Sequence, residues 1–217
     1  MAQAPAQAGA WIAPEGGQLI WTETAGERDE ALYMESSIYL ERPIHERVAL
    51  VAAPWVTSDD FTAGWDGLRW ETTLGAKAAV LRRPGQVMAV QGAAVWHSDP
   101  FGTCEETGIE LRWLGGAAFG DGRGFLNLEA AQRSFEGGCR TGRYDLTLGY
   151  RPDEGWLGMA QFFFDDPELG ESALKAQLTL VRFGASGRGV QVGLRGRVDG
   201  EAVEPALVLG FWGVGRE

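Results

Sequence analysis

His97, Ser98 and Asp99 are consecutive in the chain and are the three residue types of a hydrolase triad. They fall at the end of a predicted strand, where neighbouring side chains point to opposite faces and cannot converge on one substrate. His45, the other histidine, lies in a different predicted turn. We therefore expect no catalytic residues.

Acidic clusters are the second candidate for chemistry, because carboxylate oxygens bind divalent cations. The clusters are Asp59 with Asp60, Glu105 with Glu106, and Asp165 and Asp166 with Glu168. None has the spacing of a calcium loop, and we interpret them as solvated loops. The segment FGDGRG lacks the Lys-Ser/Thr of a phosphate loop, and no Cys-x-x-Cys is present. We expect no metal and no cofactor.

Charged residues of both signs form the most informative constellation. They recur at alternate positions along segments whose other positions are apolar, a pattern typical of strands with one apolar face. We predict that they share one face of a sheet and line a lumen. The set comprises Glu35, Glu71, Lys77, Glu110, Arg112, Glu129, Arg133, Asp145, Arg151, Lys175, Arg195 and Arg197.

The elements that carry these residues are about twelve strand-like runs. They cover residues 16–26, 31–43, 46–57, 68–81, 86–97, 107–118, 124–135, 143–152, 155–165, 172–183, 188–198 and 204–213. Tight connections such as RRPGQ and RPDEG alternate with longer or acidic ones such as HSDPFGTCEET. This layout predicts a single all-β, up-and-down antiparallel transmembrane β-barrel of about 12 strands, with short periplasmic turns and longer extracellular loops.

Two features favour this barrel over a soluble β-barrel or sandwich binding protein, which stays an alternative. The apolar face is rich in Ala and Gly, which lipid tolerates better than a close-packed core does. Aromatic residues near strand ends suit two interfacial girdles. They are Trp21, Tyr39, Trp55, Trp96, Trp113, Tyr144, Tyr150, Trp156 and Trp212. No apolar run reaches about 18 residues, but a spanning strand needs only about 9–11.

The net charge of −11 argues against a nucleic-acid partner. We expect residues 1–10 to be a flexible mature N-terminus of an exported protein and residues 11–217 to form the barrel. Cys104 and Cys139 fall in neighbouring loops of the longer class. Because the periplasm is oxidising, we predict a Cys104–Cys139 disulfide across these loops.

Several segments resemble proteobacterial outer-membrane β-barrel proteins of unassigned function. They are GAWIAPEGGQLIWTET, YLERPIHERVAL, GFLNLEAAQR, RYDLTLGYRP and PALVLGFWGVGRE. The tail GVGRE departs from the aromatic C-terminus that is common in such barrels. The resemblance implies a place in the bacterial outer membrane, with lipid, lipopolysaccharide and the barrel-insertion machinery as partners, and it leaves the oligomeric state open.

These observations predict a narrow channel for passive passage of small polar or charged solutes. A plugged structural or adhesive barrel without transport and an outer-membrane lipid hydrolase are the alternatives within the same fold. Which solute passes is not encoded in any motif of the sequence.

Overall fold

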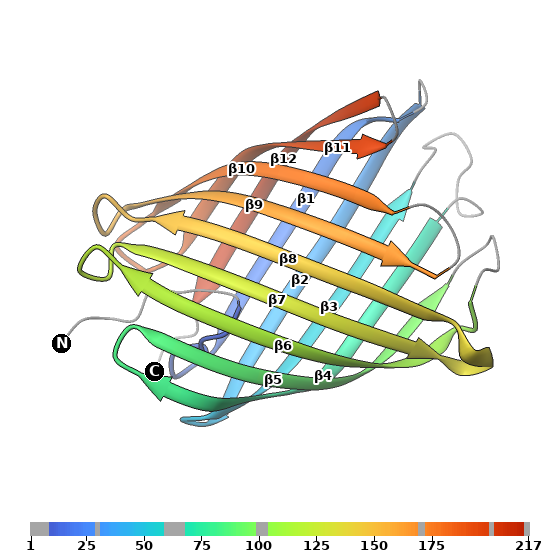
Figure 1. The fold of residues 1–217 in the computed structure, drawn as a ribbon. Helices are drawn as coiled ribbons and strands as arrows, with labels where there is room; N and C mark the ends of the chain where they lie inside the picture. Colours follow the sequence, from blue (N-terminus) through green and yellow to red (C-terminus); the bar gives the residue numbers. More distant parts are fainter. Residues whose placement is uncertain are drawn as a thin grey trace.

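The fold is a closed barrel of twelve antiparallel strands, shown in Figure 1. The computed structural model describes residues 9–28, 31–58, 68–98, 104–168, 172–199 and 202–214. The strands are β1 (Gln18–Arg28), β2 (Ala31–His45), β3 (Val48–Ser58), β4 (Leu68–Arg83), β5 (Gln86–Ser98), β6 (Thr107–Phe119), β7 (Gly124–Phe135), β8 (Arg140–Tyr150), β9 (Trp156–Pro167), β10 (Ala173–Phe183), β11 (Gly189–Asp199) and β12 (Ala202–Val214), and one short 3-10 turn, η2 (Glu136–Gly138), separates β7 from β8. The predicted all-β, up-and-down topology is confirmed.

Each strand pairs with its neighbours in sequence, and β12 returns to pair with β1 from Val214 opposite Gln18 to Ala206 opposite Gly26. Closure removes both sheet edges, so the backbone polar groups of the strands are paired within the wall. The register is interrupted near Pro43 in β2 and between Ala79 and Leu81 in β4. Among the described residues no helix is long and apolar enough to cross a membrane.

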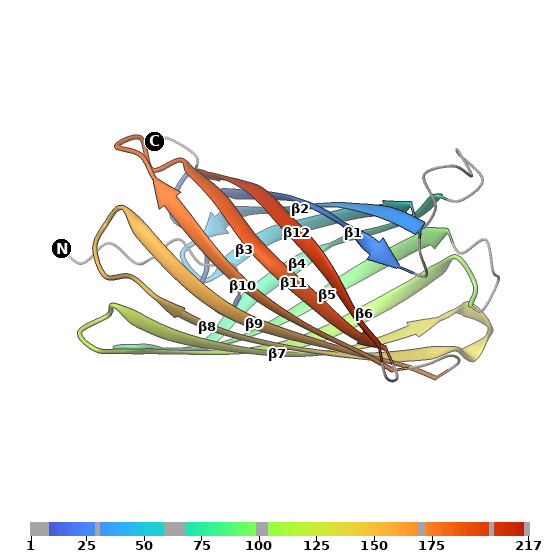
Figure 2. The same ribbon diagram turned by 90° about the horizontal axis from the view of Figure 1, so that it is seen from above.

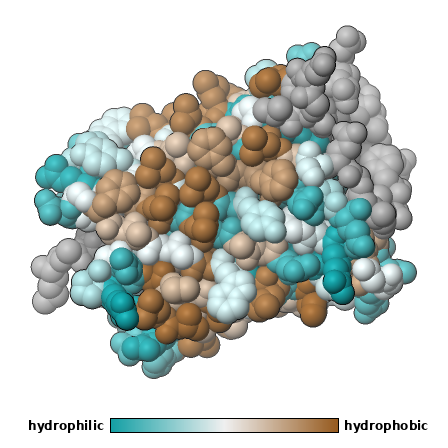
Figure 3. All heavy atoms as spheres, viewed as in Figure 1, coloured by the Kyte–Doolittle hydropathy of each residue, from teal (hydrophilic) through white to brown (hydrophobic). Residues whose placement is uncertain are grey.

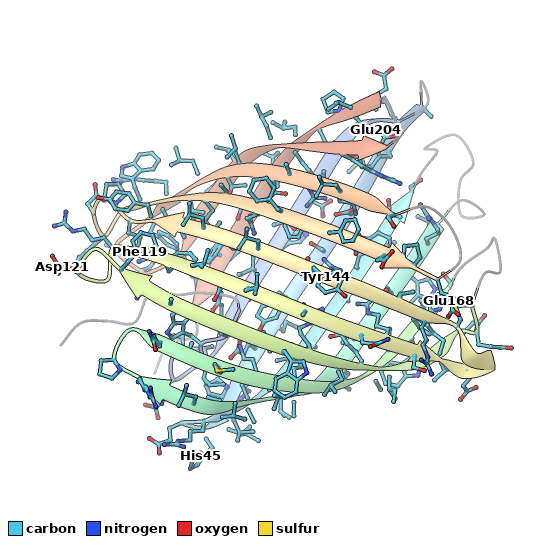
Figure 4. All side chains as sticks on the ribbon, viewed as in Figure 1. His45, Phe119, Asp121, Tyr144, Glu168 and Glu204 are labelled. Carbon is cyan, nitrogen blue, oxygen red and sulfur yellow. A yellow bond between two sulfur atoms is a disulfide. The ribbon has the colours of Figure 1, made fainter. Side chains whose placement is uncertain are left out.

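The two ends of the barrel differ. At one end, which we call the turn end, the tight connections gather, β1 begins and β12 ends; this end lies at the left in Figure 1 and in the turned view of Figure 2. His45, Phe119 and Asp121 mark it in Figure 4, while Glu168 and Glu204 mark the opposite loop end. The connections fall alternately at the two ends, as the sequence predicts, but their lengths overlap: only two residues separate β1 from β2 and β11 from β12 at the loop end.

The outer face of the barrel is apolar. Exposed side chains include Leu32, Leu74, Ile109, Leu128, Leu178 and Leu194. Figure 3 shows apolar side chains gathered over the strands between more hydrophilic ends. An exposed apolar band around a closed barrel is the arrangement that lipid, rather than water, stabilises.

Three of the aromatic residues that we assigned to interfacial girdles lie inside the barrel instead. Trp212 is 4% exposed, and Tyr39 and Trp55 line the interior. Each occupies one of the alternate strand positions that face inward, in β12, β2 and β3 respectively. Tyr39, for example, is two residues before the buried Glu41. Trp21, Trp96, Tyr144 and Tyr150 are on the outer face, as is Trp113, which lies in the middle of β6 rather than near an end.

The interior has two layers. Near the turn end it is apolar, with Phe125, Leu157, Met159, Val181, Phe183 and Trp212 in one cluster. A second cluster contains Ala79, Val87, Ala89 and Leu114 together with Ala10 of the N-terminal segment. Toward the loop end, polar and charged side chains replace these apolar residues. The candidate site lies in this polar layer, next to its boundary with the apolar one.

Candidate functional site: the polar lumen

A cavity of about 650 Å³ occupies the polar part of the barrel interior. Every strand of the barrel contributes inward side chains to its wall or to the apolar layer beneath it. The cavity ends toward the turn end at lining residues that are mostly apolar: Gly9, Leu114, Phe125, Met159 and Trp212. The cavity therefore has polar walls and is closed toward the turn end by apolar residues.

Ten of the twelve residues that we predicted to line a lumen are in the lining of this cavity, all except Lys77 and Arg151. The strand parity that the sequence predicts places them on one face, and closure of the barrel turns that face inward. These ten residues come from seven strands, β2, β4, β6, β7, β8, β10 and β11.

Arg112 is the centre of the largest charge network. Its guanidinium donates to Glu110 at 3.0 Å and to Glu129 at 2.7 Å, and lies 3.6 Å from Asp145. These carboxylates come from β6, β7 and β8, so one arginine joins three consecutive strands. Charges removed from bulk water keep their ionised form when they are paired and hydrogen-bonded in this way.

Two ion pairs reach across the lumen between strands that are not neighbours. Arg133 of β7 donates to Glu71 of β4 at 2.7 Å, and also to Glu110 at 2.8 Å. Arg195 of β11 donates to Glu35 of β2 at 2.7 Å. In each case two strands lie between the partners in the barrel wall. Because these two cross-lumen pairs lie inside the barrel, the passage is narrower than the barrel itself.

Sequence reasoning missed part of the lining. Arg143 lies 3.3 Å from Asp145 and 3.8 Å from Asp165, and Lys175 lies 3.7 Å from Asp165. Asp165 was assigned to a loop cluster, but β9 continues to Pro167 and turns this carboxylate into the lumen. Arg143 has the same strand parity as Asp145, and that parity was the signal that could have identified it.

The charges of the described residues in the lining are balanced. Its cationic residues are Arg69, Arg112, Arg133, Arg143, Lys175, Arg195 and Arg197, and its anionic residues are Glu35, Glu71, Glu110, Glu129, Asp145, Asp165 and Asp166, seven of each sign. Four glutamines and several threonines fill the spaces between them. The lining thus offers many hydrogen bonds without a net charge.

The two remaining predicted residues, Lys77 and Arg151, lie between the cavity and the turn end. The side chain of Lys77 is fully buried and is paired with Glu41 at 2.6 Å. Arg151 follows the end of β8 at the turn end, and its guanidinium carbon lies 4.7 Å from the centre of the Phe183 ring. Burial lowers the pKa of Arg151. Neither residue contacts the cavity.

The N-terminal segment lies inside the barrel. Ala10 is fully buried and Ala13 is 6% exposed. The structure thus differs from our expectation of a flexible N-terminus at Gly9 and Ala10, whereas residues 1–8 lie outside the described residues. Sequence reasoning did not identify this segment as a part of the interior.

His97 and Ser98, the described residues of the candidate triad, contact different partners. The His97 ring packs edge-on against Phe135, 4.8 Å between ring centres, whereas Ser98 accepts a hydrogen bond from the backbone of Trp70. His45 lies at the turn end, where its Nδ1 accepts a hydrogen bond from the Arg47 backbone. Asp99 lies outside the described residues. The described part of the chain also contains no group of three or more metal-ligating side chains.

One acidic cluster, Asp165 and Asp166 with Glu168, has protein partners. Glu168 accepts a hydrogen bond from the Arg140 backbone at 2.8 Å, and Asp166 accepts one from Ser172 at 2.9 Å. Asp59 and Asp60 lie outside the described residues.

The predicted disulfide is confirmed. Cys104 and Cys139 are bonded, with their Cα atoms 5.7 Å apart, and they join the segment before β6 to the segment before β8. The bond spans the β6–β7 hairpin at the loop end.

Comparison with solved structures supports the fold. The KdgM porin matches with a TM-score of 0.64 and 7% identity, over 92% of this chain and 99% of that one. The COG4313 outer membrane channel from Pseudomonas putida F1 matches with 0.65 and 12%, over 94% and 97%. Outer membrane phospholipase A from Escherichia coli matches with 0.53 and 14%, over 93% and 97%. No family model and no curated protein sequence matches. The chain therefore has the fold of outer-membrane β-barrel proteins.

Proposed function

We propose that the protein is a narrow passive channel of the bacterial outer membrane for small polar solutes, with its turn end in the periplasm. The observation that carries this proposal is the polar cavity of about 650 Å³ enclosed by an apolar outer wall. A barrel of this kind presents lipid with apolar side chains and presents a solute with hydrogen-bonding ones.

Solute size is limited by the two cross-lumen pairs, Arg133–Glu71 and Arg195–Glu35. Solute charge is discriminated weakly, because a lining with seven charges of each sign creates little net potential along the path. The amides of Gln91, Gln161 and Gln177 replace part of the hydration of an uncharged polar solute. We therefore assign small neutral or zwitterionic solutes as the class that passes most readily.

Two other functions are compatible with the fold. A plugged structural barrel is favoured by one observation, the N-terminal segment that lies beneath the cavity. A lipid hydrolase requires a serine and a histidine that converge on the outer face, and Ser98 and His97 point to opposite faces. Hydrolysis therefore has no support among the described residues.

Planar-bilayer recording tests the proposal. Detergent-refolded protein, whose folding is verified by heat-modifiable migration on a gel, should give discrete openings with a potassium-to-chloride permeability ratio near one. Arg133→Gln breaks one cross-lumen pair and removes one lumen cation, so we expect a larger conductance and a shift toward potassium. Inserted protein that gives no openings, together with an Arg133→Gln variant that gives none, would favour the plugged structural barrel.

A further inference from the structure

The segment from Gly9 to Gly17 enters the barrel at the turn end and lies directly beneath the cavity. Gly9 is itself in the cavity lining, and Ala10 packs against the buried Ala79, Ala89 and Leu114. The segment is thus enclosed by the wall on the path between the cavity and the turn end.

Apolar packing holds the segment through Trp11. The indole packs against both apolar clusters of the interior and meets the Phe125 ring edge-on, with 6.5 Å between ring centres. It fills a notch at Gly116 of β6, where a Cβ atom would overlap the indole. Since close-packed interiors leave no spare volume for such a ring, the wall is shaped to receive Trp11.

Polar contacts hold the backbone of the segment. Lys77 Nζ donates to the carbonyl oxygens of Gly9 and Trp11, both at 2.8 Å, and to Glu41 at 2.6 Å. Glu41 in turn accepts a hydrogen bond from the Ala13 amide at 2.8 Å. An ammonium has three donors, and the segment satisfies two of them.

The Gly116 notch, Lys77 and Glu41 together form a binding site, which we call the seat of the segment. Lys77 and Glu41 are fully buried, and burying a charge without partners is costly. The segment supplies hydrogen bonds to both charges, in addition to the one that Tyr39 donates to Glu41 at 2.6 Å. The barrel therefore has a built site for its own N-terminal segment.

We propose that residues 9–17 are the gate of the channel: seated, they close the lumen at the turn end, and release of the segment opens it. This inference rests on the proposed channel function. The covalent link between the segment and the wall is at Gln18, where β1 begins. Gly16 and Gly17, with φ of 93° and 87°, precede that point and let the backbone turn there. Release about this glycine pair requires no change in the strands.

A matched pair of glycines provides the test. Gly116→Ala places a methyl group in the notch that Trp11 fills. Gly115→Ala, on the adjacent residue, points outward, where the nearest atom to a new Cβ is the Leu128 carbonyl oxygen at 4.0 Å. Both exchanges alter the strand equally, but only the first opposes the seated segment. Trp11→Ala is a second releasing variant that leaves the wall unchanged.

The first readout is release of the segment. Chymotrypsin cleaves after Trp11 when the segment leaves the barrel, and mass spectrometry of refolded protein measures the loss of the N-terminal peptide. Overpacking of a well-packed site shifts an equilibrium by about tenfold or more, so we expect Gly116→Ala to be cleaved about tenfold faster than the wild type. Gly115→Ala should be cleaved at the wild-type rate. Trp11→Ala, which loses the cleavage site, is assessed by conductance alone.

The second readout is the open fraction in planar bilayers. We expect it to rise about tenfold in Gly116→Ala, and also to rise in Trp11→Ala, with Gly115→Ala unchanged. Channels that open equally in all four proteins while Gly116→Ala releases its segment would overturn the gate but leave the channel standing. No openings in any of them would overturn the proposed channel function and the gate with it. Equal cleavage of Gly116→Ala and Gly115→Ala would overturn the seat itself.

Discussion

Adjacent residues in the middle of β9 test which face of the barrel meets lipid. Phe162 is 45% exposed on the outer face, between Leu146 of β8 and Ala176 of β10. Gln161 lines the cavity and accepts a hydrogen bond from Gln177 at 3.0 Å. The same substitution by arginine therefore places a charge in lipid at one position and in the polar lumen at the next.

The expected magnitudes differ. An arginine on the lipid face costs about 2–4 kcal/mol near the bilayer midplane, which is where the centre of β9 falls in a spanning barrel. An arginine at position 161 removes one acceptor from Gln177, and the loss of one hydrogen bond is worth about 1 kcal/mol. We thus expect Phe162→Arg to lower the free energy of unfolding about two to four times more than Gln161→Arg.

Denaturant titration in lipid vesicles measures both values, with Phe162→Leu as a control for the loss of the ring. Equal costs at the two positions, or a larger cost for Gln161→Arg, would mean that the outer face does not meet lipid. In a soluble β-protein, Phe162→Arg would carry no free-energy cost from placing a charge in lipid.

Three further predictions concern single features. Arg195→Gln removes one lumen cation and should shift the permeability ratio toward cations, as reversal potentials in a salt gradient would show; an unchanged ratio would place Arg195 off the conducting path. Replacement of Cys104 and Cys139 by serine should lower the free energy of unfolding by about 3–4 kcal/mol, since the bond closes a loop of about 35 residues, and a midpoint unaffected by the exchange would contradict this. Lys77→Met should cost about 3–5 kcal/mol because it leaves Glu41 buried without its partner, whereas Lys77→Met combined with Glu41→Gln should cost much less. Equal costs for these single and double variants would show that the buried pair is not coupled.

Strand alternation predicted the barrel and ten of the twelve lumen residues, because the period of two fixes the face of every residue once the strand is placed. The errors have the same origin. Tyr39 was assigned to a girdle by its residue type, although it shares the parity of Glu35 and Glu41. Asp165 was assigned to a loop by its acidic neighbours, although it shares the parity of Gln161.

The seated N-terminal segment could not be predicted. AWIAPEGG has neither a helical nor a strand period, and its proline and glycines are typical of loops. Its partners Glu41 and Lys77 lie on β2 and β4, far along the chain, and no local pattern connects them with Trp11. Only closure of the barrel brings these residues together.

Single-channel recording of wild-type protein in a potassium chloride gradient shows directly whether the lumen conducts. We expect brief openings whose current reverses near zero millivolts, because the described lumen lining carries equal numbers of positive and negative charges. For Gly116→Ala we expect the same reversal potential with longer openings, since that exchange adds no charge. Folded, inserted protein that never opens, in the wild type and in Gly116→Ala alike, would show that the barrel is not a channel.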